Sequence, residues 1–263
     1  MPIVTLTTDF GLKDGNVGVM KGVIWRFAPQ VQIVDISHLV APQNVPEAAL
    51  VLRRSAPYFP EGSIHLLVVD PGVGTSRRPI AARLGRQFFV GPDNGAVTLL
   101  LEYTESEGGT TTFVHLDRPE YWLPEVSHVF HGRDIFAPVA GHMAAGTPLD
   151  KLGTIIDDPV RLALPRPERT PQGWRGQVIH IDHFGNIATN IEYIHLAGRK
   201  VETVSLGGVN TDGMVSTFGE RPPGTLVSLF GSTGNLLVCE VNGSAASRLN
   251  ARIGDALEVT TGM

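Results

Sequence analysis

Hydrophobic positions follow two different periods along the first 160 residues of the chain. The run at 64–69 is apolar and rich in branched side chains, which is typical of a strand buried on both faces of a sheet. In contrast, Val19, Val23 and Phe27 recur at helical spacing before Ala28 and Pro29 end the segment. The same criteria predict strands at 3–8, 31–36, 64–69, 79–84, 87–90 and 113–116, and helices at 16–27, 44–56, 96–103 and 135–145. Because strands and helices alternate, we expect an α/β domain with a doubly wound, mostly parallel sheet.

The pattern changes near residue 160. The stretch 162–171 contains three prolines and has no hydrophobic period, so it is expected to be a linker. Beyond it lie short β-like runs separated by Gly and Asn, at 176–181, 201–206, 225–230, 235–241 and 256–260, and one short helix at 244–249. We therefore expect an α/β N-terminal domain at 1–161 and a smaller, all-β, barrel-like C-terminal domain at 172–263.

Composition narrows the possible partners and location. The 263 residues carry a formal net charge of −5 and no basic block, which makes a nucleic-acid partner unexpected. A single cysteine, Cys239, excludes an internal disulfide framework and a cysteine-rich metal site. No apolar run approaches the roughly 20 residues that span a bilayer, and no charged leader precedes an apolar segment at the start. We expect a cytoplasmic protein without a membrane partner.

A polar loop follows the predicted strand at 64–69. Asp70 stands at the end of that strand, Pro-Gly-Val-Gly follows, and Arg77 and Arg78 close the loop. Ligands of open α/β sheets bind just beyond the carboxyl ends of strands, so Asp70 and the arginines occupy a favoured position for chemistry. The loop is not a dinucleotide fingerprint, which needs Gly at position 77, and it lacks the Gly-Lys-Ser/Thr of a phosphate loop. A tight turn in which Asp70 holds loop amides is the structural alternative.

Three other loops carry candidate side chains in the same half. Asp9 ends the first strand, where a carboxylate can accept hydrogen bonds from a ribose diol or cap the loop. Phe10 could stack on a base or join the core, and His131 precedes a helix. Together with Asp70 and Asp93, these loops could converge at one edge of the sheet. They could also bind a divalent metal, although no His-x-His, His-Glu-x-x-His or Asp-x-Asp pair supports one, and we expect no metal.

The second half has its polar residues in turns between β-like runs. The clusters lie at 181–190, 230–235 and 240–244. An asparagine side chain offers both a donor and an acceptor, as an adenine edge requires. The same residues also form hairpin turns, so position alone leaves both interpretations open.

Six sequence blocks, taken in order, resemble one known family. They are Thr-Asp-Phe-Gly at 8–11, Val-Asp-Pro-Gly-Val-Gly-Thr-Ser-Arg-Arg at 69–78, Gly-Pro-Asp-Asn-Gly at 91–95, Phe-His-Gly-Arg-Asp at 130–134, Asp-His-Phe-Gly-Asn at 182–186 and Asn-Gly-Ser-Ala at 242–245. The chain is similar to the S-adenosyl-L-methionine (SAM) hydroxide adenosyltransferases, or SAM hydrolases, which are relatives of the SAM-dependent fluorinase and chlorinase. The resemblance extends over nearly the whole chain.

The resemblance implies a fold, an assembly and a reaction. The fold would be an α/β domain followed by a β-barrel domain. The assembly would be a homotrimer whose active sites lie between subunits. The reaction would be hydrolysis of SAM to adenosine and L-methionine by in-line attack of water or hydroxide at ribose C5′, without a cofactor. An Asp, an Arg seven residues later and a distant His mark the hydroxide-using branch, and Asp70, Arg77 and His131 occupy these positions.

The resemblance also implies substrate-binding residues. Asp9 and Phe10 would bind the ribose and base, and the adenine would contact Asn186 and the backbone from Glu240 to Asn242. The other expected substrate contacts are Asp182, Phe184 and Ser232, with Asp182 and Ser232 at the methionine end. The chain departs from the fluorinase at Thr233, where a Ser-Arg pair would hold the methionine carboxylate. Alternatives to hydrolysis are a SAM-dependent halogenase, a metal-dependent nucleotidase or phosphatase using Asp9, Asp70 and Asp93, and a non-catalytic nucleoside-binding module.

Overall fold

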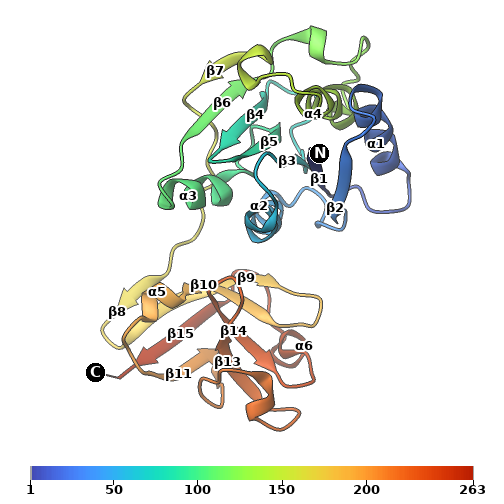
Figure 1. Ribbon diagram of the computed structural model, residues 1–263. Helices are drawn as coiled ribbons and strands as arrows, with labels where there is room; N and C mark the ends of the chain where they lie inside the picture. The colour runs from blue at the N-terminus through green and yellow to red at the C-terminus, as the bar shows by residue number, and fades with distance from the viewer. Residues whose placement is uncertain (1, 263) are drawn as a thin grey trace. The chain divides into compact units, whose positions relative to one another are not determined.

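The computed structural model describes residues 2–262, which divide between Ala163 and Leu164 into two compact units (Figure 1). The first unit contains β1 (Ile3–Thr8), α1 (Asn16–Phe27), β2 (Gln32–Ser37), α2 (Val45–Ser55), β3 (Ile64–Val68), β4 (Pro79–Leu84), β5 (Gln87–Pro92), α3 (Thr98–Ser106), β6 (Thr111–His115), α4 (Ala137–Ala144) and β7 (Thr154–Ile156). Its strands form one sheet in the order β2-β1-β3-β5-β4-β6-β7. The α/β class expected from the hydrophobic pattern is confirmed.

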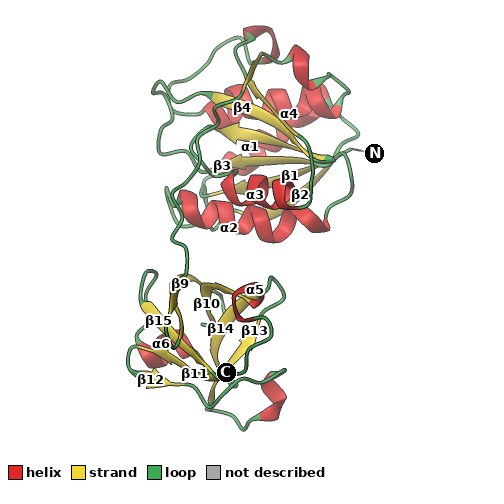
Figure 2. Cartoon of the chain, turned by 90° about the vertical axis from the view of Figure 1, so that its left-hand side faces the viewer, coloured by secondary structure: helices red, strands yellow, loops and turns green. Residues whose placement is uncertain are grey.

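Helices cover both faces of this sheet (Figure 2). Met20 and Ile24 of α1 pack with Val139 of α4 in one core, and Leu52 of α2 packs with Leu101 of α3 in the other. The two cores explain why β3 is apolar except for His65, since all five of its residues are buried. Asp70 therefore follows a strand that is fixed from both sides.

The sheet is parallel only from β2 to β5. The pairings β2–β1, β1–β3 and β3–β5 are parallel, whereas β5–β4, β4–β6 and β6–β7 are antiparallel. Only Gly85 and Arg86 separate β4 from β5, and such a short connection permits a hairpin but no parallel crossover. Gly85 has φ +59°, which suits a tight turn. The antiparallel share is larger than strand–helix alternation predicted.

The second unit is an antiparallel β structure with a single sheet. It contains β8 (Glu168–Thr170), β9 (Gly173–Ile181), β10 (Ile187–Glu192), α5 (Tyr193–Leu196), β11 (Val201–Leu206), β12 (Val209–Asn210), β13 (Leu226–Phe230), β14 (Asn235–Glu240), α6 (Ala245–Leu249) and β15 (Ala256–Thr261). The order is β12-β11-β15-β9-β10-β14-β13, with β8 paired to β9. The expected barrel-like, all-β character of this part is confirmed.

Two sequence expectations are corrected here. The stretch 162–171 is not an irregular linker throughout, because β8 lies within it and Leu162 donates its N–H to Thr98 Oγ1 over 2.9 Å. Strand β10 was not predicted, because Thr and Asn interrupt its apolar residues. Its Thr189 is fully buried and donates to the Leu236 carbonyl over 2.9 Å, so a polar side chain belongs to the core.

Within residues 2–262, no helix combines the length and the apolar character needed to cross a bilayer.

His65 makes the stability of the first unit dependent on pH. Its ring is 1% exposed, Nδ1 lies 2.8 Å from Thr5 Oγ1, and burial lowers the pKa to about 4. The folded pKa lies below the unfolded value of 6.5, so the stabilisation is complete above pH 6.5 and is lost as the pH falls toward 4. We expect a loss of about 3 kcal/mol over that window.

Hydrogen exchange of the β1 and β3 amides at about pH 7 and about pH 4 measures this effect. The pH-dependent loss of stability should be smaller in His65→Gln than in the unmodified protein. Equal losses in both proteins would contradict the role of His65.

Candidate active site

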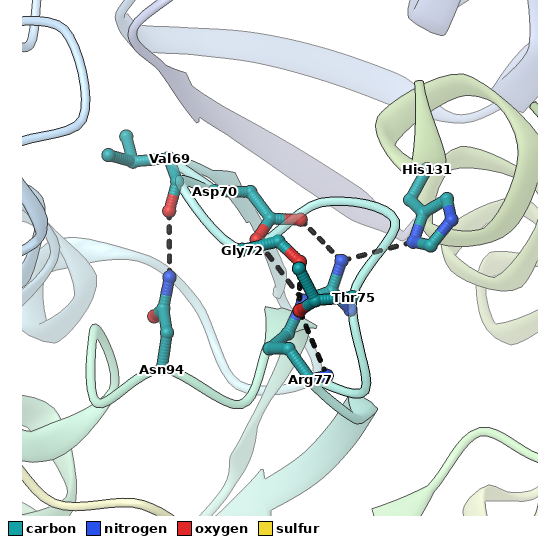
Figure 3. Close-up of polar contacts among 7 residues, drawn as sticks. All are labelled: Val69, Asp70, Gly72, Thr75, Arg77, Asn94 and His131. Carbon is teal, nitrogen blue, oxygen red and sulfur yellow. Dashed lines mark hydrogen bonds and ion pairs between the residues drawn. The ribbon is translucent and has the colours of Figure 1, made fainter. Parts of the chain in front are cut away.

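The loop after β3 brings Asp70 and Arg77 together. The Asp70 carbonyl accepts from Val73 N over 3.2 Å, and Thr75 Oγ1 donates to the Gly72 carbonyl over 2.7 Å. On the other side, Asn94 Nδ2 donates to the Val69 carbonyl over 2.9 Å (Figure 3). The loop thus folds back on itself at the carboxyl end of a buried strand.

Arg77 forms a two-point ion pair with Asp70. Nε donates to Oδ1 over 3.1 Å and Nη2 donates to Oδ2 over 2.5 Å. The Arg77 and Asp70 side chains are only 7% and 5% exposed. Two parallel charge-assisted bonds fix the plane of the guanidinium. Arg77 Nη1 is buried and has no hydrogen-bond partner among residues 2–262, so one donor group of this oriented cation is left unpaired there.

His131 contacts the same guanidinium. Its Nδ1 lies 3.0 Å from Arg77 Nη2, and Figure 3 shows the arginine between the carboxylate and the imidazole. A guanidinium can only donate, so Nδ1 must be the acceptor. The neutral ring then carries its proton on Nε2, and that N–H is a donor.

Burial and neighbouring charge set the titration of the trio Asp70, Arg77 and His131. Burial lowers the pKa of His131, and the adjacent Arg77 charge lowers it further. Burial raises the pKa of Asp70 above its ordinary value, and Arg77 offsets part of that rise. Near neutral pH the trio therefore contains a neutral imidazole beside a paired cation.

Asp93 takes part in a different ion-pair network. Its Oδ2 accepts from Arg78 Nε over 2.9 Å and its Oδ1 accepts from Val160 N over 2.8 Å. Arg78 Nη1 also donates to Asp158 Oδ1 over 2.7 Å. Among residues 2–262, no three His, Cys, Asp or Glu side chains are grouped in a way that could hold a metal ion. Of the loops expected to converge, those of Asp70 and His131 meet at Arg77. The Asp93 carboxylate instead pairs with Arg78.

Asp9 and Phe10 lie in the loop after β1. Asp9 Oδ2 accepts from Gln43 N over 2.8 Å, and Gln43 itself has φ +65°. The Phe10 ring packs edge-on against Phe130, with centroids 5.7 Å apart. Phe130 directly precedes His131, so Phe10 contacts the segment that carries the imidazole.

In the second unit, Asp182 uses its carboxylate within its own loop. Oδ1 accepts from the N–H groups of Phe184 and Asn186, both over 2.9 Å, and Oδ2 accepts from Asn186 Nδ2 over 2.8 Å. The loop packs on the start of α6, where Ala246 N donates to the Gly185 carbonyl over 3.0 Å. Asp182 and Asn186 are therefore close together, and each already satisfies part of the other's hydrogen bonding.

The remaining residues expected to bind substrate lie at turns of the second unit. Phe184 is 74% exposed, and Ser232 and Asn242 are exposed as well. Asn242 adopts φ +55°. Glu240 Oε1 lies 3.3 Å from Arg248 Nη1 and is half-buried. The turns thus expose the ring of Phe184 and the polar side chains of Ser232 and Asn242 at the surface of the second unit.

Two residues that shape the site were not singled out in the sequence. Asn94 ties its loop to the strand end beside Asp70, and Asp134 is a fully buried carboxylate three residues after His131. Both stand inside blocks that were recognised, Gly-Pro-Asp-Asn-Gly and Phe-His-Gly-Arg-Asp. Their place in these blocks was the available signal, because the bonds by which they shape the site, Asn94 to the Val69 carbonyl and Ser127 N–H to Asp134, involve backbone groups that leave no pattern in the sequence.

The chain is thus a protein of two units, an α/β unit followed by an antiparallel β unit. In the first unit, an arginine beyond a central strand is held between a buried aspartate and a histidine. Residues 4–153 match the SAM hydroxide adenosyltransferase N-terminal domain, and residues 176–258 match the C-terminal domain of the same family. The chain belongs to the SAM hydroxide adenosyltransferase family.

Individual relatives agree with this assignment. The chain is 40% identical to the (R)-S-adenosyl-L-methionine hydrolase of Salinispora tropica, over 99% of this chain and 98% of the relative. It is 31% identical to the fluorinase of Actinopolyspora mzabensis, over 72% of this chain and 71% of that enzyme. The crystal structure of an uncharacterized conserved protein from Thermotoga maritima is similar, with a TM-score of 0.89 and 35% identity over 99% of this chain and 100% of that one.

Proposed function

We propose that this protein hydrolyses SAM to adenosine and L-methionine. The observation that carries the proposal is the buried Arg77, which bridges Asp70 and His131 and whose Nη1 has no partner in the described part of the chain. Family membership and the full-length similarity to a SAM hydrolase support the choice of substrate.

The chemical difficulty of this reaction is the nucleophile. The sulfonium of SAM leaves as a neutral thioether, so the leaving group needs no proton. Bulk water, however, has a pKa of about 15.7 and attacks poorly. A buried guanidinium that donates to the attacking oxygen stabilises the hydroxide character that develops in the transition state. We assign this role to Arg77 Nη1, with Asp70 fixing the orientation of the cation.

His131 is assigned the role of orienting the water. Its Nδ1 is occupied by Arg77, so its Nε2–H is free to donate to the water oxygen. In this arrangement the ring has no free acceptor nitrogen and acts as a donor rather than as the base. The C5′–O bond forms as the C5′–S bond breaks, and the proton of the attacking water passes to solvent. Holding the water in line with C5′ lowers the barrier by several kcal/mol, because positional freedom is lost before the reaction begins.

The substrate contacts proposed here are those expected from the resemblance. Asp9 would accept from the ribose hydroxyls, and Phe10 would pack beside the nucleoside. Asn186 and the backbone from Glu240 to Asn242 would face the adenine. Asp182 and Ser232 would face the methionine end, and Phe184 would be a further substrate contact. Because Asp182 already accepts three hydrogen bonds in its loop, we expect it to contribute mainly negative charge toward the substrate ammonium.

Chromatography of a reaction with SAM tests the function directly. Adenosine and methionine should appear in equal amounts, with and without a chelator. No adenosine would contradict the proposal. Metal-dependent release would favour the nucleotidase alternative, and adenosine binding without turnover would favour the nucleoside-binding module. Formation of a 5′-halogenated adenosine with added chloride or fluoride would move the chain to the halogenase branch, to which the fluorinase relative belongs.

Activity should depend on pH through His131. The lowered pKa of this ring means that it stays neutral at pH 6.5, its ordinary midpoint, and becomes protonated only at lower pH. Protonation removes the Nδ1 acceptor and sets a cation against Arg77, so kcat/KM should fall on the acid side with a midpoint below 6.5.

Initial rates across the acid and neutral range measure this midpoint. His131→Gln is the matched variant, because it cannot become protonated. It should retain only the acid limb due to Asp70, whose pKa is raised above 3.8. A wild-type midpoint at or above 6.5 would contradict the assignment of a neutral His131.

A homotrimer with active sites between subunits and a cytoplasmic location are proposed from the resemblance and the composition. Analytical ultracentrifugation of the purified chain tests the assembly, and a monomer that retains full activity would overturn it.

A further inference from the structure

The segment that carries His131 is closed into a loop by a buried carboxylate. Ser127 N donates to Asp134 Oδ2 over 2.8 Å, so the eight residues 127–134 form a ring with His131 between the two ends. After His131 the chain enters a π-helix (Gly132–Phe136), in which Asp134 N donates to the Phe130 carbonyl over 3.1 Å. The position of the imidazole is therefore defined from both sides.

The hydrogen bonds of Asp134 join parts of this loop to one another and to the chain that leads into it. Its side chain is 1% exposed, and it pairs with its sequence neighbour Arg133 through contacts of 2.5 and 3.0 Å. Its backbone carbonyl also accepts from Leu123 N over 2.8 Å, which adds a second connection to the approaching chain. Burying a carboxylate is unfavourable unless it is paired, and a paired buried charge can select one conformation without adding stability.

The loop also contacts the segment that holds Arg77. Gly74 has φ +76°, and a Cβ at this position would lie 2.2 Å from the His128 carbonyl oxygen. The backbone of the His131 loop thus rests on the backbone of the Asp70–Arg77 loop, and only glycine permits that approach. The Ser127–Asp134 hydrogen bond closes the His131 loop on itself, and the Gly74–His128 contact places that loop against the segment of Arg77.

We propose that Asp134 and Gly74 are positioning residues that set the contact between Arg77 Nη2 and His131 Nδ1. Asp134 fixes the shape of the loop, and Gly74 fixes its distance from Arg77. Neither residue acts on the substrate, and each works through His131. The activity readout of this inference rests on the proposed function.

Gly74→Ala is the first test. We expect a fall in kcat of about 10- to 100-fold with little change in KM, because a displacement of about 1 Å can cost a hundredfold. Gly108→Ala is the matched control, since Gly108 has φ +72°, is exposed like Gly74, and has open space around its Cβ position. The control carries the same backbone strain and should retain its kcat.

Asp134→Asn is the second test, with Asp117→Asn as its control. Asp117 Oδ1 also accepts a backbone N–H, from Thr154 over 3.1 Å, but lies elsewhere in the first unit. Both Asp134→Asn and Gly74→Ala should lose their effect in a His131→Ala background, where we expect about a twofold change or less. An equal loss in both backgrounds would show that these residues act independently of His131 and would overturn the proposal.

The ¹⁵N chemical shifts of the His131 ring give a readout that needs no turnover. In the unmodified protein, Nδ1 should show the shift of an unprotonated, hydrogen-bonded nitrogen. Both variants should move this shift toward that of a free imidazole, which exchanges between two tautomers. Unchanged shifts in two folded variants would overturn the proposal even if SAM is hydrolysed. Changed shifts in a protein that does not hydrolyse SAM would preserve the positioning role and reject the proposed function alone.

Discussion

Arg77→Ala should lower kcat for adenosine formation by about a thousandfold, since one lost donor to a developing oxyanion costs 10²–10³ and here the orientation of His131 is lost with it. Arg77 donates to both Asp70 and His131, so its removal separates the trio. KM for SAM should change little, because the guanidinium is assigned to the nucleophile and not to the bound substrate.

Arg77→Lys distinguishes charge from geometry. Lysine keeps the positive charge but lacks the planar fork that reaches two partners at once. We expect it to recover less than a tenth of the lost rate. Arg86→Ala is the control, because Arg86 is paired with Glu61 on the surface and both side chains are well exposed. Full activity in Arg77→Ala would exclude the proposed role.

Asp70→Ala should lower the free energy of unfolding by about 3–5 kcal/mol, because it leaves a buried guanidinium without its counter-ion. The two side chains are 5% and 7% exposed, so solvent does little to screen the charge that remains. Urea denaturation of the purified variant, with ellipticity and fluorescence followed in parallel, measures the loss.

Replacing both partners separates a stability effect from a catalytic one. Asp70→Leu combined with Arg77→Met should recover much of the stability, since an apolar pair of similar volume is often tolerated, while activity stays lost. Glu61→Ala is the surface control and should change stability by about 1 kcal/mol or less. If Asp70→Ala were as stable as the unmodified protein, the pair would not be the buried ion pair described above.

Hydrophobic patterning predicted most elements of the first unit because its helices and strands bury strongly apolar faces. The helix at 16–27 has the bounds of α1, and the strand at 3–8 has those of β1. The pattern did not distinguish parallel from antiparallel pairing beyond β5, because strand direction depends on connection length. Strand β10 escaped prediction because its buried Thr189 satisfies its hydroxyl on another strand, and sequence does not reveal such partners.

The candidate site was predictable as a set of positions but not as a set of bonds. Asp70, Arg77 and His131 were selected from blocks of sequence, and the structure brings their side chains within hydrogen-bonding distance. The tautomer of His131 and the unpartnered Nη1 of Arg77 follow from side-chain geometry alone. Asp93 looked equivalent to Asp70 in sequence, yet it binds Arg78, because choosing between neighbouring arginines depends on where the loop turns.

The boundary between Ala163 and Leu164 separates the residues proposed for the reaction from the loops proposed to bind adenine and methionine. Asp70, Arg77 and His131 all precede that point, as do the carboxylate and glycine proposed to position the histidine. The loops assigned to adenine and methionine, from Asp182 to Asn242, all follow it. Substitutions in the later loops should therefore change which sulfonium is accepted and leave the choice of nucleophile untouched. Changes on one side of this boundary should then alter the substrate, and changes on the other side the nucleophile.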